Sequence, residues 1–221
     1  MEKEALTMVL ILAVVLSLCG ISGWLMFKDG REYEKADKRT IRAELIYGSI
    51  MVALTLCISV TYVMHHANMD VFTMLKRLIL LCVIWPLAYI DYKTYRIPNT
   101  FIIYGLSCRA VLVPFELMLN PYFRVAVMSE LIAATALFLA ALLCTICLRG
   151  SIGAGDMKLF VVMGLFLGLE MIWSAVFTAL LISFLIAVYL LIMKKKTKKD
   201  SIPFGPAIVS SVYLSIFLIG G

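Results

Sequence analysis

Long apolar stretches separated by short polar segments make up almost the whole chain. A bilayer core of about 30 Å needs roughly 20 helical residues to cross it, and stretches of about that length recur along the sequence. They predict helices at about 5–27, 43–64, 73–91, 99–118, 124–148, 156–169, 171–193 and 204–220. The sixth is short, and its boundary with the seventh falls at Leu169–Glu170. The pattern predicts an all-α integral membrane protein, a polytopic bundle of about eight transmembrane helices.

Composition supports this fold class. The chain has 221 residues, of which 63% are hydrophobic and 15% are charged, whereas a soluble domain is roughly half apolar and a quarter charged. The first apolar stretch follows a net acidic start and is too long for a cleaved secretory signal, so we expect it to stay attached. The composition therefore predicts a single transmembrane domain over residues 1–221, with the lipid bilayer as its surroundings and no soluble domain.

Basic residues predict the orientation of the helices. Most of the 20 Lys and Arg residues lie in alternate loops, after the first, third, fifth and seventh predicted helices. Loops rich in Lys and Arg stay in the cytoplasm, so both chain termini should lie outside. The run at 194–199 is read as an orientation signal that also touches anionic lipid, and no nucleic-acid partner is expected because aromatic residues do not interleave with it. Lys76 and Arg77 go against the pattern; either they reach to the outer headgroups, or the third helix begins later.

Two aspartates stand out against this background. Asp91 begins the segment DYKTYRIPN (91–99), and Asp156 lies in GAGDMK (153–158). Each lies where a long apolar run meets a short basic loop, on the predicted cytoplasmic side. An ionisable residue at membrane depth is costly and is a functional candidate by default. A pair of such carboxylates suggests acid/base chemistry.

The residues after Asp91 predict a rigid helix end beside a turn. Pro98 disfavours helical backbone at Ile97 and allows a new helix to begin near Asn99. Asp91 is therefore expected to end the third helix, next to a hydrated turn.

The residues around Asp156 predict a different setting, at the start of a helix. Gly153 and Gly155 allow unusual backbone angles and the close approach of another segment. Asp156 would then lie in the first turn of the sixth helix, where the macrodipole favours a carboxylate. Lys158 either tunes the pair of aspartates or points into the headgroups.

Two carboxylates a few ångströms apart share one proton at neutral pH, because both cannot ionise cheaply. This state suits peptide hydrolysis: the ionised member takes a proton from the attacking water, and the protonated member donates to the carbonyl oxygen. The helix N-terminus favours Asp156 as the base. The alternative is that both aspartates pair with neighbouring Arg or Lys as interfacial anchors.

Three motifs together resemble the type IV prepilin peptidases, membrane aspartyl proteases that remove the short basic leader from prepilins, pseudopilins and archaeal preflagellins. They are the aspartate with a basic turn ending in Ile-Pro-Asn (91–99), Gly-x-Gly-Asp-x-Lys (153–158) and Pro-Phe-Gly-Pro (203–206). Each lies at a predicted cytoplasmic helix end. Residues 72–221 would form the catalytic core, and residues 1–71 would hold two N-terminal helices and a basic cytoplasmic loop.

The resemblance implies an endopeptidase of the cytoplasmic (inner) membrane with its active site at the cytoplasmic face. Its substrate would be a prepilin or pseudopilin precursor with a basic leader and an apolar N-terminal helix. Asp91 and Asp156 would be the catalytic pair, and no metal or cofactor is implied. Further residues would shape the active-site loop or lie near the substrate: Gly153, Gly155, Lys158, Lys93, Arg96, Pro98, Asn99, Pro203, Gly205 and Pro206.

Departures from the family pattern argue against a second activity. Members that also methylate the new N-terminus carry two Cys-x-x-Cys pairs in a cytoplasmic domain and a Gly-Ser-Phe-x-Asn motif. Here the loop after the first helix contains no cysteine, and Cys19-Gly20-Ile21-Ser22-Gly23 only loosely resembles the second motif. Methylation is therefore not expected, and the chain fits the peptidase-only members that serve tight-adherence pili or related systems. Cys144 and Cys147 have the spacing of half a zinc site but lack a second pair, so helix packing is the better interpretation.

Other charged residues and other functions remain as alternatives. Glu116 and Glu130 are expected to be anchors near the outer face. Arg109 falls within the fourth helix and either reaches to the headgroups, pairs with Glu116, or contacts substrate. The rival functions are a small ion-coupled transporter whose aspartates relay ions and a catalytically inert assembly scaffold.

Overall fold

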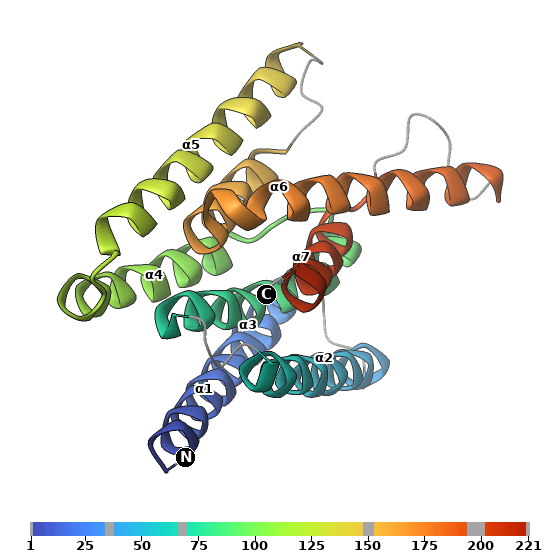
Figure 1. The fold of residues 1–221 in the computed structure, drawn as a ribbon. Helices are drawn as coiled ribbons and strands as arrows, with labels where there is room; N and C mark the ends of the chain where they lie inside the picture. The colour runs from blue at the N-terminus through green and yellow to red at the C-terminus, as the bar shows by residue number, and fades with distance from the viewer. Residues whose placement is uncertain (1, 34–37, 66–69, 148–152, 194–201, 220–221) are drawn as a thin grey trace.

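Seven α-helices make up the described part of the chain (Figure 1). The computed structural model describes residues 2–33, 38–65, 70–147, 153–193 and 202–219. The helices are α1 (Glu2–Tyr33), α2 (Lys38–His65), α3 (Val71–Thr94), α4 (Asn99–Leu119), α5 (Phe123–Cys147), α6 (Ala154–Ile192) and α7 (Gly205–Ile219). The first six are long and apolar enough to cross a membrane, and α7 is shorter. The prediction of an all-α, multi-pass membrane protein is confirmed.

The number of helices differs from the prediction at α6. This helix covers both of the segments predicted at 156–169 and 171–193, so eight separate helices are not confirmed. Its backbone is nevertheless broken at Gly168, where φ is 63° and ψ is −175°. Glycine adopts such angles without steric cost. The predicted boundary at Leu169–Glu170 therefore marks a break within α6 and not a loop.

α3 lies at the centre of the bundle and contacts α1, α2, α4, α6 and α7. Trp85 of α3 is fully buried, and its indole N–H donates to the Ser22 hydroxyl of α1 at 3.2 Å. The Tyr47 hydroxyl of α2 donates to the Trp85 carbonyl at 2.8 Å. Gly23 and Gly48 face the Trp85 ring from α1 and α2. These contacts tie the first two helices to α3, although hydropathy alone says nothing of how they pack.

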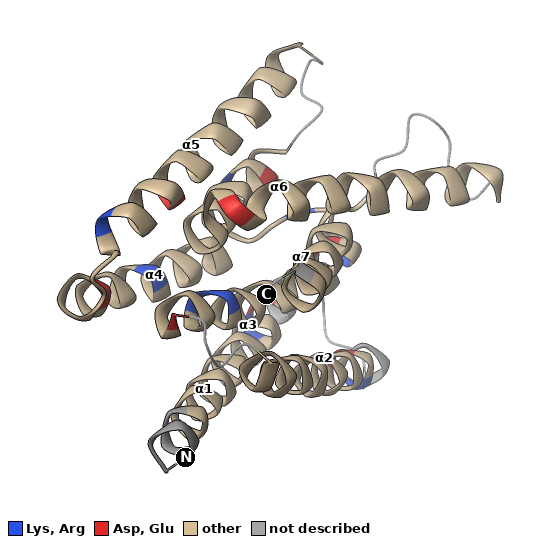
Figure 2. Ribbon diagram, viewed as in Figure 1, with Lys and Arg blue, Asp and Glu red and all other residues tan. Residues whose placement is uncertain are grey.

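Charged residues occupy few positions on the ribbon, and several of them are buried (Figure 2). Lys76 and Arg77 are 3% and 5% exposed, and α3 begins at Val71, earlier than predicted. These two residues therefore do not reach to the outer headgroups, and the helix does not begin after them; both predicted explanations are wrong. Glu116 and Glu130 are also buried and form ion pairs inside the bundle, so they are not interfacial anchors.

Of the three interpretations of Arg109, pairing is the one that the structure shows. The Arg109 Nη2 atom lies 2.8 Å from the Glu116 Oε2 atom. The basic run at 194–199, which contributes to the predicted orientation, lies outside the described residues.

Candidate active site

Asp91 lies one turn before the end of α3 and is only 5% exposed. The sequence predicted that this helix ends at Asp91, but it continues to Thr94. Tyr95 closes it in a left-handed conformation, with φ of 53°, and its backbone N–H donates to the Asp91 carbonyl at 2.9 Å. A left-handed residue with a Cβ atom costs about 1 kcal/mol or more, so the contacts around this turn must hold it. Asp91 therefore lies on a regular helix beside a sharply turned segment.

The N-terminus of α7 packs directly against the Asp91 side chain. The Gly205 backbone N–H donates to the Asp91 Oδ2 atom at 2.6 Å, and both residues are buried. A Cβ atom on Gly205 would lie 2.7 Å from the Asp91 Cβ atom and 2.9 Å from Oδ2. Only glycine allows this close approach, because any side chain would overlap the carboxylate. The Pro-Phe-Gly-Pro motif thus supplies a backbone donor to Asp91.

Asp156 lies in the first turn of α6, as predicted. Gly153 is the N-cap residue, with extended backbone, and the Asp156 Oδ2 atom lies 3.1 Å from where a Gly153 Cβ atom would be. The carboxylate therefore folds back over its own helix N-terminus, in the manner of the acidic residue of a capping box. A Cβ atom on Gly155 would lie 3.0 Å from the Ile97 Cβ atom. The second glycine of the motif thus lets α6 approach the segment that follows α3.

Both carboxylates line one pocket of about 290 Å³. The pocket lies where α3 ends and α6 begins, and its walls come from two segments far apart in sequence. The lining residues are Asp91, Tyr95, Arg96, Ile97, Gly153, Ala154, Gly155 and Asp156. Each aspartate interacts with a helix N-terminus, Asp91 with that of α7 and Asp156 with that of α6. The macrodipole argument therefore applies to both and no longer singles out Asp156 as the base.

Comparison with known proteins places the chain in a family. A family model described as the type IV leader peptidase family matches residues 78–192, a stretch that contains both aspartates. The chain belongs to the type IV leader peptidase family.

A curated relative from Bacillus subtilis (strain 168) is named prepilin leader peptidase/N-methyltransferase. The two proteins are 34% identical over 85 residues, which is 38% of this chain and 34% of the relative. The chain thus matches about a third of the length of that relative. No solved structure matches the chain.

Lys158 was expected either to tune the pair of aspartates or to point into the headgroups, but it makes a different contact. Its Nζ atom donates to the Asn99 Oδ1 atom at 2.9 Å, which joins the first turns of α6 and α4. Pro98 is the N-cap residue of α4, so the predicted start near Asn99 is confirmed. The Lys93 Nζ atom lies 3.8 Å from the Glu44 Oε1 atom of α2, and Lys93 is not one of the residues that line the pocket. Its place near the substrate stays a prediction.

The remaining motif residues differ in how close they come to the aspartates. Arg96 lines the pocket, Pro203 precedes α7, and Pro206 lies in the first turn of α7. Tyr95 also lines the pocket, although the sequence did not single it out. No signal in the residue type could have shown this, because its place depends on a left-handed backbone that tyrosine rarely adopts.

A metal centre is not apparent near the pocket. Among the residues that the structure describes, no three His, Cys, Asp or Glu side chains are grouped so that they could hold a metal ion. The pocket itself offers two carboxylates, those of Asp91 and Asp156.

Proposed function

We propose that the protein is a membrane aspartyl endopeptidase that cleaves the short basic leader from type IV prepilin-like precursors, including pseudopilins and the pilins of tight-adherence systems. One observation carries the proposal: Asp91 of α3 and Asp156 of α6 line the same pocket, together with residues 95–97 and 153–155. Membership of the leader peptidase family supports it. The proposed catalytic residues are these two aspartates.

The two carboxylates supply an acid and a base to one hydrolysis. The ionised carboxylate takes a proton from water as the water oxygen bonds to the carbonyl carbon of the scissile peptide, and the protonated partner donates its proton to the carbonyl oxygen. As the tetrahedral intermediate collapses and the C–N bond breaks, the carboxyl that took the water proton gives it to the leaving nitrogen. The other carboxylate takes back a proton from a hydroxyl of the intermediate, so the pair returns to its starting state. The pair titrates as a unit, so we assign the two roles to the pair and not to single residues.

Backbone contacts would hold the pair in place during this reaction. The Gly205 N–H fixes one oxygen of Asp91, and Gly155 brings α6 close to Ile97. Preorganised donors of this kind favour catalysis because they need not reorganise as charge shifts. Gly153, Gly155 and Gly205 are therefore proposed as residues that shape the site.

The pocket lies at a helix end, which suits a substrate that is itself anchored in the membrane. We propose that the substrate's apolar N-terminal helix lies in the bilayer beside the bundle, while its basic leader extends past the pocket at the cytoplasmic face. Loops rich in Lys and Arg on this side favour that orientation, with both termini outside. The membrane would be the cytoplasmic (inner) membrane.

Methylation of the new N-terminus is not part of the proposal. The Bacillus subtilis relative is named as both a peptidase and an N-methyltransferase, but the chain matches only about a third of its length. The loop between α1 and α2 contains no cysteine, so the cysteine pairs expected of methylating members are not found in it. We propose leader cleavage alone.

Co-expression with a prepilin tests the proposal. The prepilin is recovered from membranes and its mass is measured for cells that carry the wild type, Asp91→Asn or Asp156→Asn. The proposal predicts loss of the leader, with no added methyl group, in wild-type cells alone. Equal processing in all three, with the proteins present in equal amounts, would contradict the proposal, because cleavage would not depend on the aspartates. The transporter and the inert scaffold would then be the better interpretations.

A further inference from the structure

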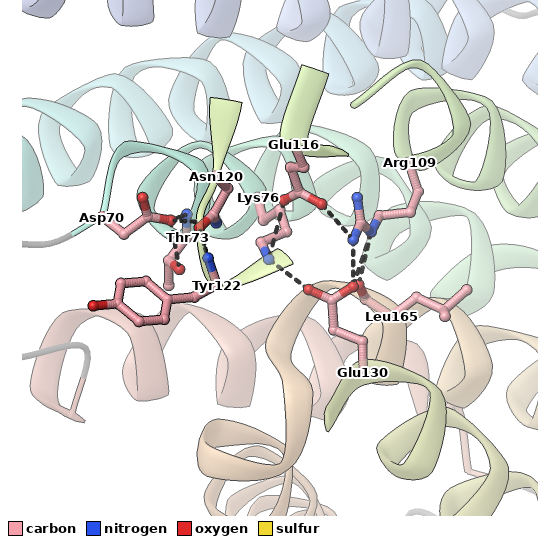
Figure 3. Close-up of polar contacts among 9 residues, drawn as sticks. All are labelled: Asp70, Thr73, Lys76, Arg109, Glu116, Asn120, Tyr122, Glu130 and Leu165. Carbon is pink, nitrogen blue, oxygen red and sulfur yellow. Dashed lines mark hydrogen bonds and ion pairs between the residues drawn. The ribbon is translucent and has the colours of Figure 1, made fainter. Parts of the chain in front are cut away.

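Four charged side chains lie buried together between α3, α4 and α5 (Figure 3). Lys76, Arg109, Glu116 and Glu130, here called the charge cluster, are each at most 5% exposed. The Lys76 Nζ atom lies 3.2 Å from Glu116 Oε1 and also binds Glu130. The Arg109 Nη2 atom lies 2.8 Å from Glu116 Oε2 and also binds Glu130. Two cations and two anions make the charge cluster neutral.

The charge cluster lies far from the candidate active site. Lys76 and Asp91 are on the same helix, and fifteen residues of helix between them correspond to about 22 Å. No step of the proposed hydrolysis uses the charge cluster. Buried ion pairs are weak evidence for stability, since apolar side chains often stabilise as well. They join side chains of α3, α4 and α5 at one place in the bundle.

One member of the charge cluster, Arg109, also contacts α6 at its break. In an unbroken α-helix the Leu169 N–H would donate to the Leu165 carbonyl, but the backbone at Gly168 separates these two groups. The Leu169 N–H instead donates to the Ser129 hydroxyl of α5 at 3.0 Å. The Leu165 carbonyl accepts from Arg109 Nε at 3.2 Å. Arg109 and Ser129 therefore satisfy two backbone groups at the break, the Leu165 carbonyl and the Leu169 N–H.

The first part of α6, from Ala154 to the break, carries Asp156 and is held by α4 near both of its ends. Near the pocket, Lys158 donates to Asn99. Near the break, Arg109 donates to Leu165. Asp156 is two residues from the first contact and nine residues from the second, and nine residues of helix span about 14 Å. Movement of Leu165 would therefore move Asp156, because a helix transmits displacement along its length.

We propose that Arg109, held in place by Glu130, positions the first part of α6 and with it Asp156. Arg109 binds the Leu165 carbonyl at the break in α6, and Glu130 of α5 binds Arg109. Lys76 and Glu116 complete the charge balance of the cluster and make no contact with the break. This inference rests on the proposed function for its effect on catalysis. Arg109 and Glu130 are positioning residues, since neither lines the pocket.

Two double variants separate positioning from charge balance. Lys76→Gln/Glu116→Gln and Arg109→Gln/Glu116→Gln each leave one buried cation and one buried anion. The first retains Arg109 with Glu130 and with the Leu165 carbonyl, whereas the second removes the guanidinium from the break. The proposal predicts a wild-type kcat for prepilin cleavage in the first. It predicts a kcat lower by about tenfold or more in the second, because misplacing a catalytic group by about 1 Å has effects of this size.

A distance measurement provides a readout that does not need a substrate. Spin labels are placed at Tyr92, which is exposed beside Asp91, and at Val161, which is half-buried on the first part of α6, in a variant free of other cysteines. Pulsed electron paramagnetic resonance then reports the distance between the helices that carry the aspartates. The wild type and Lys76→Gln/Glu116→Gln should give one narrow distribution. Arg109→Gln/Glu116→Gln should give a shifted or broader one.

The two readouts keep the two proposals apart. Equal distances and equal rates in both double variants would overturn the positioning role and leave the peptidase function standing. The label-to-label distance could differ between the two double variants while no protein, the wild type included, cleaves the prepilin. That result would overturn the peptidase function and leave the positioning role standing.

A third variant covers the case in which Arg109→Gln/Glu116→Gln does not fold. Ser129→Ala removes the acceptor of the Leu169 N–H without changing any charge, and Ser17→Ala is its control, because the exposed Ser17 hydroxyl donates to the Val14 carbonyl of its own helix. The proposal predicts a broadened distance distribution and a lower kcat for Ser129→Ala, and no change for Ser17→Ala. A wild-type distribution and rate for Ser129→Ala would overturn it.

Discussion

Replacing Gly205 with alanine perturbs the hydrogen bond from the Gly205 N–H to the Asp91 carboxylate. The added Cβ atom would lie 2.7 Å from Asp91 Cβ and 2.9 Å from Asp91 Oδ2, whereas carbon atoms in contact prefer about 3.5–4.0 Å. The N-terminus of α7 would have to withdraw by about 1 Å, which would stretch the 2.6 Å hydrogen bond from the Gly205 N–H to Asp91 beyond the usual range of about 2.7–3.2 Å.

The size of the effect follows from the bond that is lost. A hydrogen bond to a charged group contributes about 1.5–3 kcal/mol, and each 1.36 kcal/mol corresponds to about a tenfold change in rate. If the contact supports the transition state, leader release by Gly205→Ala should slow by roughly ten- to a hundredfold. Overpacking should also lower the free energy of unfolding by about 1–3 kcal/mol.

The assay is the initial rate of leader release by equal amounts of folded protein, with thermal unfolding measured in parallel. Gly20→Ala is the matched control, because outside its own stretch of helix no described atom lies within 4 Å of the position of its Cβ atom, and it should retain the wild-type rate. A wild-type rate for Gly205→Ala at equal folded protein would refute the reasoning, since it would show that the bond to Asp91 does not support catalysis.

Two further substitutions test the packing around the site. Gly164→Ala places a Cβ atom 2.6 Å from the backbone of Ala134, so α5 and α6 must separate; the protein should unfold at a lower temperature than Gly20→Ala, and equal melting temperatures would contradict this close approach. Lys158→Ala removes an exposed hydrogen bond to Asn99 worth about 0.5–1.5 kcal/mol, so the cleavage rate should fall by no more than about tenfold; complete loss of cleavage would instead indicate a direct role for Lys158.

Hydropathy located the helices well and their ends less well. The fourth helix, predicted at 99–118, is observed at Asn99–Leu119, since Pro98 marks its start. The first, predicted at 5–27, extends over Glu2–Tyr33, because helical backbone continues past the apolar part that hydropathy detects. The break at Gly168 lies beside a predicted boundary, yet the apolar pattern is the same on both sides, so only the residue type could indicate it.

The aspartates could be found from the sequence, but the contacts between segments far apart in the chain could not. Each of Asp91 and Asp156 lies in a short motif at the edge of an apolar run, which is a local pattern. The bond from Gly205 to Asp91 joins residues 114 positions apart. The pair of Lys76 and Glu130 joins residues 54 positions apart. Such contacts depend on how the helices pack, and the pattern of hydrophobic positions along one helix does not determine its neighbours.

The most direct test of the central claim uses purified protein in lipid nanodiscs with a purified prepilin. Leader release is followed for the wild type, Asp91→Asn, Asp156→Asn and the control Asp70→Asn. Asp70 caps α3 at the opposite end from Asp91, and asparagine caps helices about as well as aspartate. The account predicts release by the wild type and Asp70→Asn, and none by either pocket variant. Release at the wild-type rate by Asp91→Asn or Asp156→Asn would contradict it.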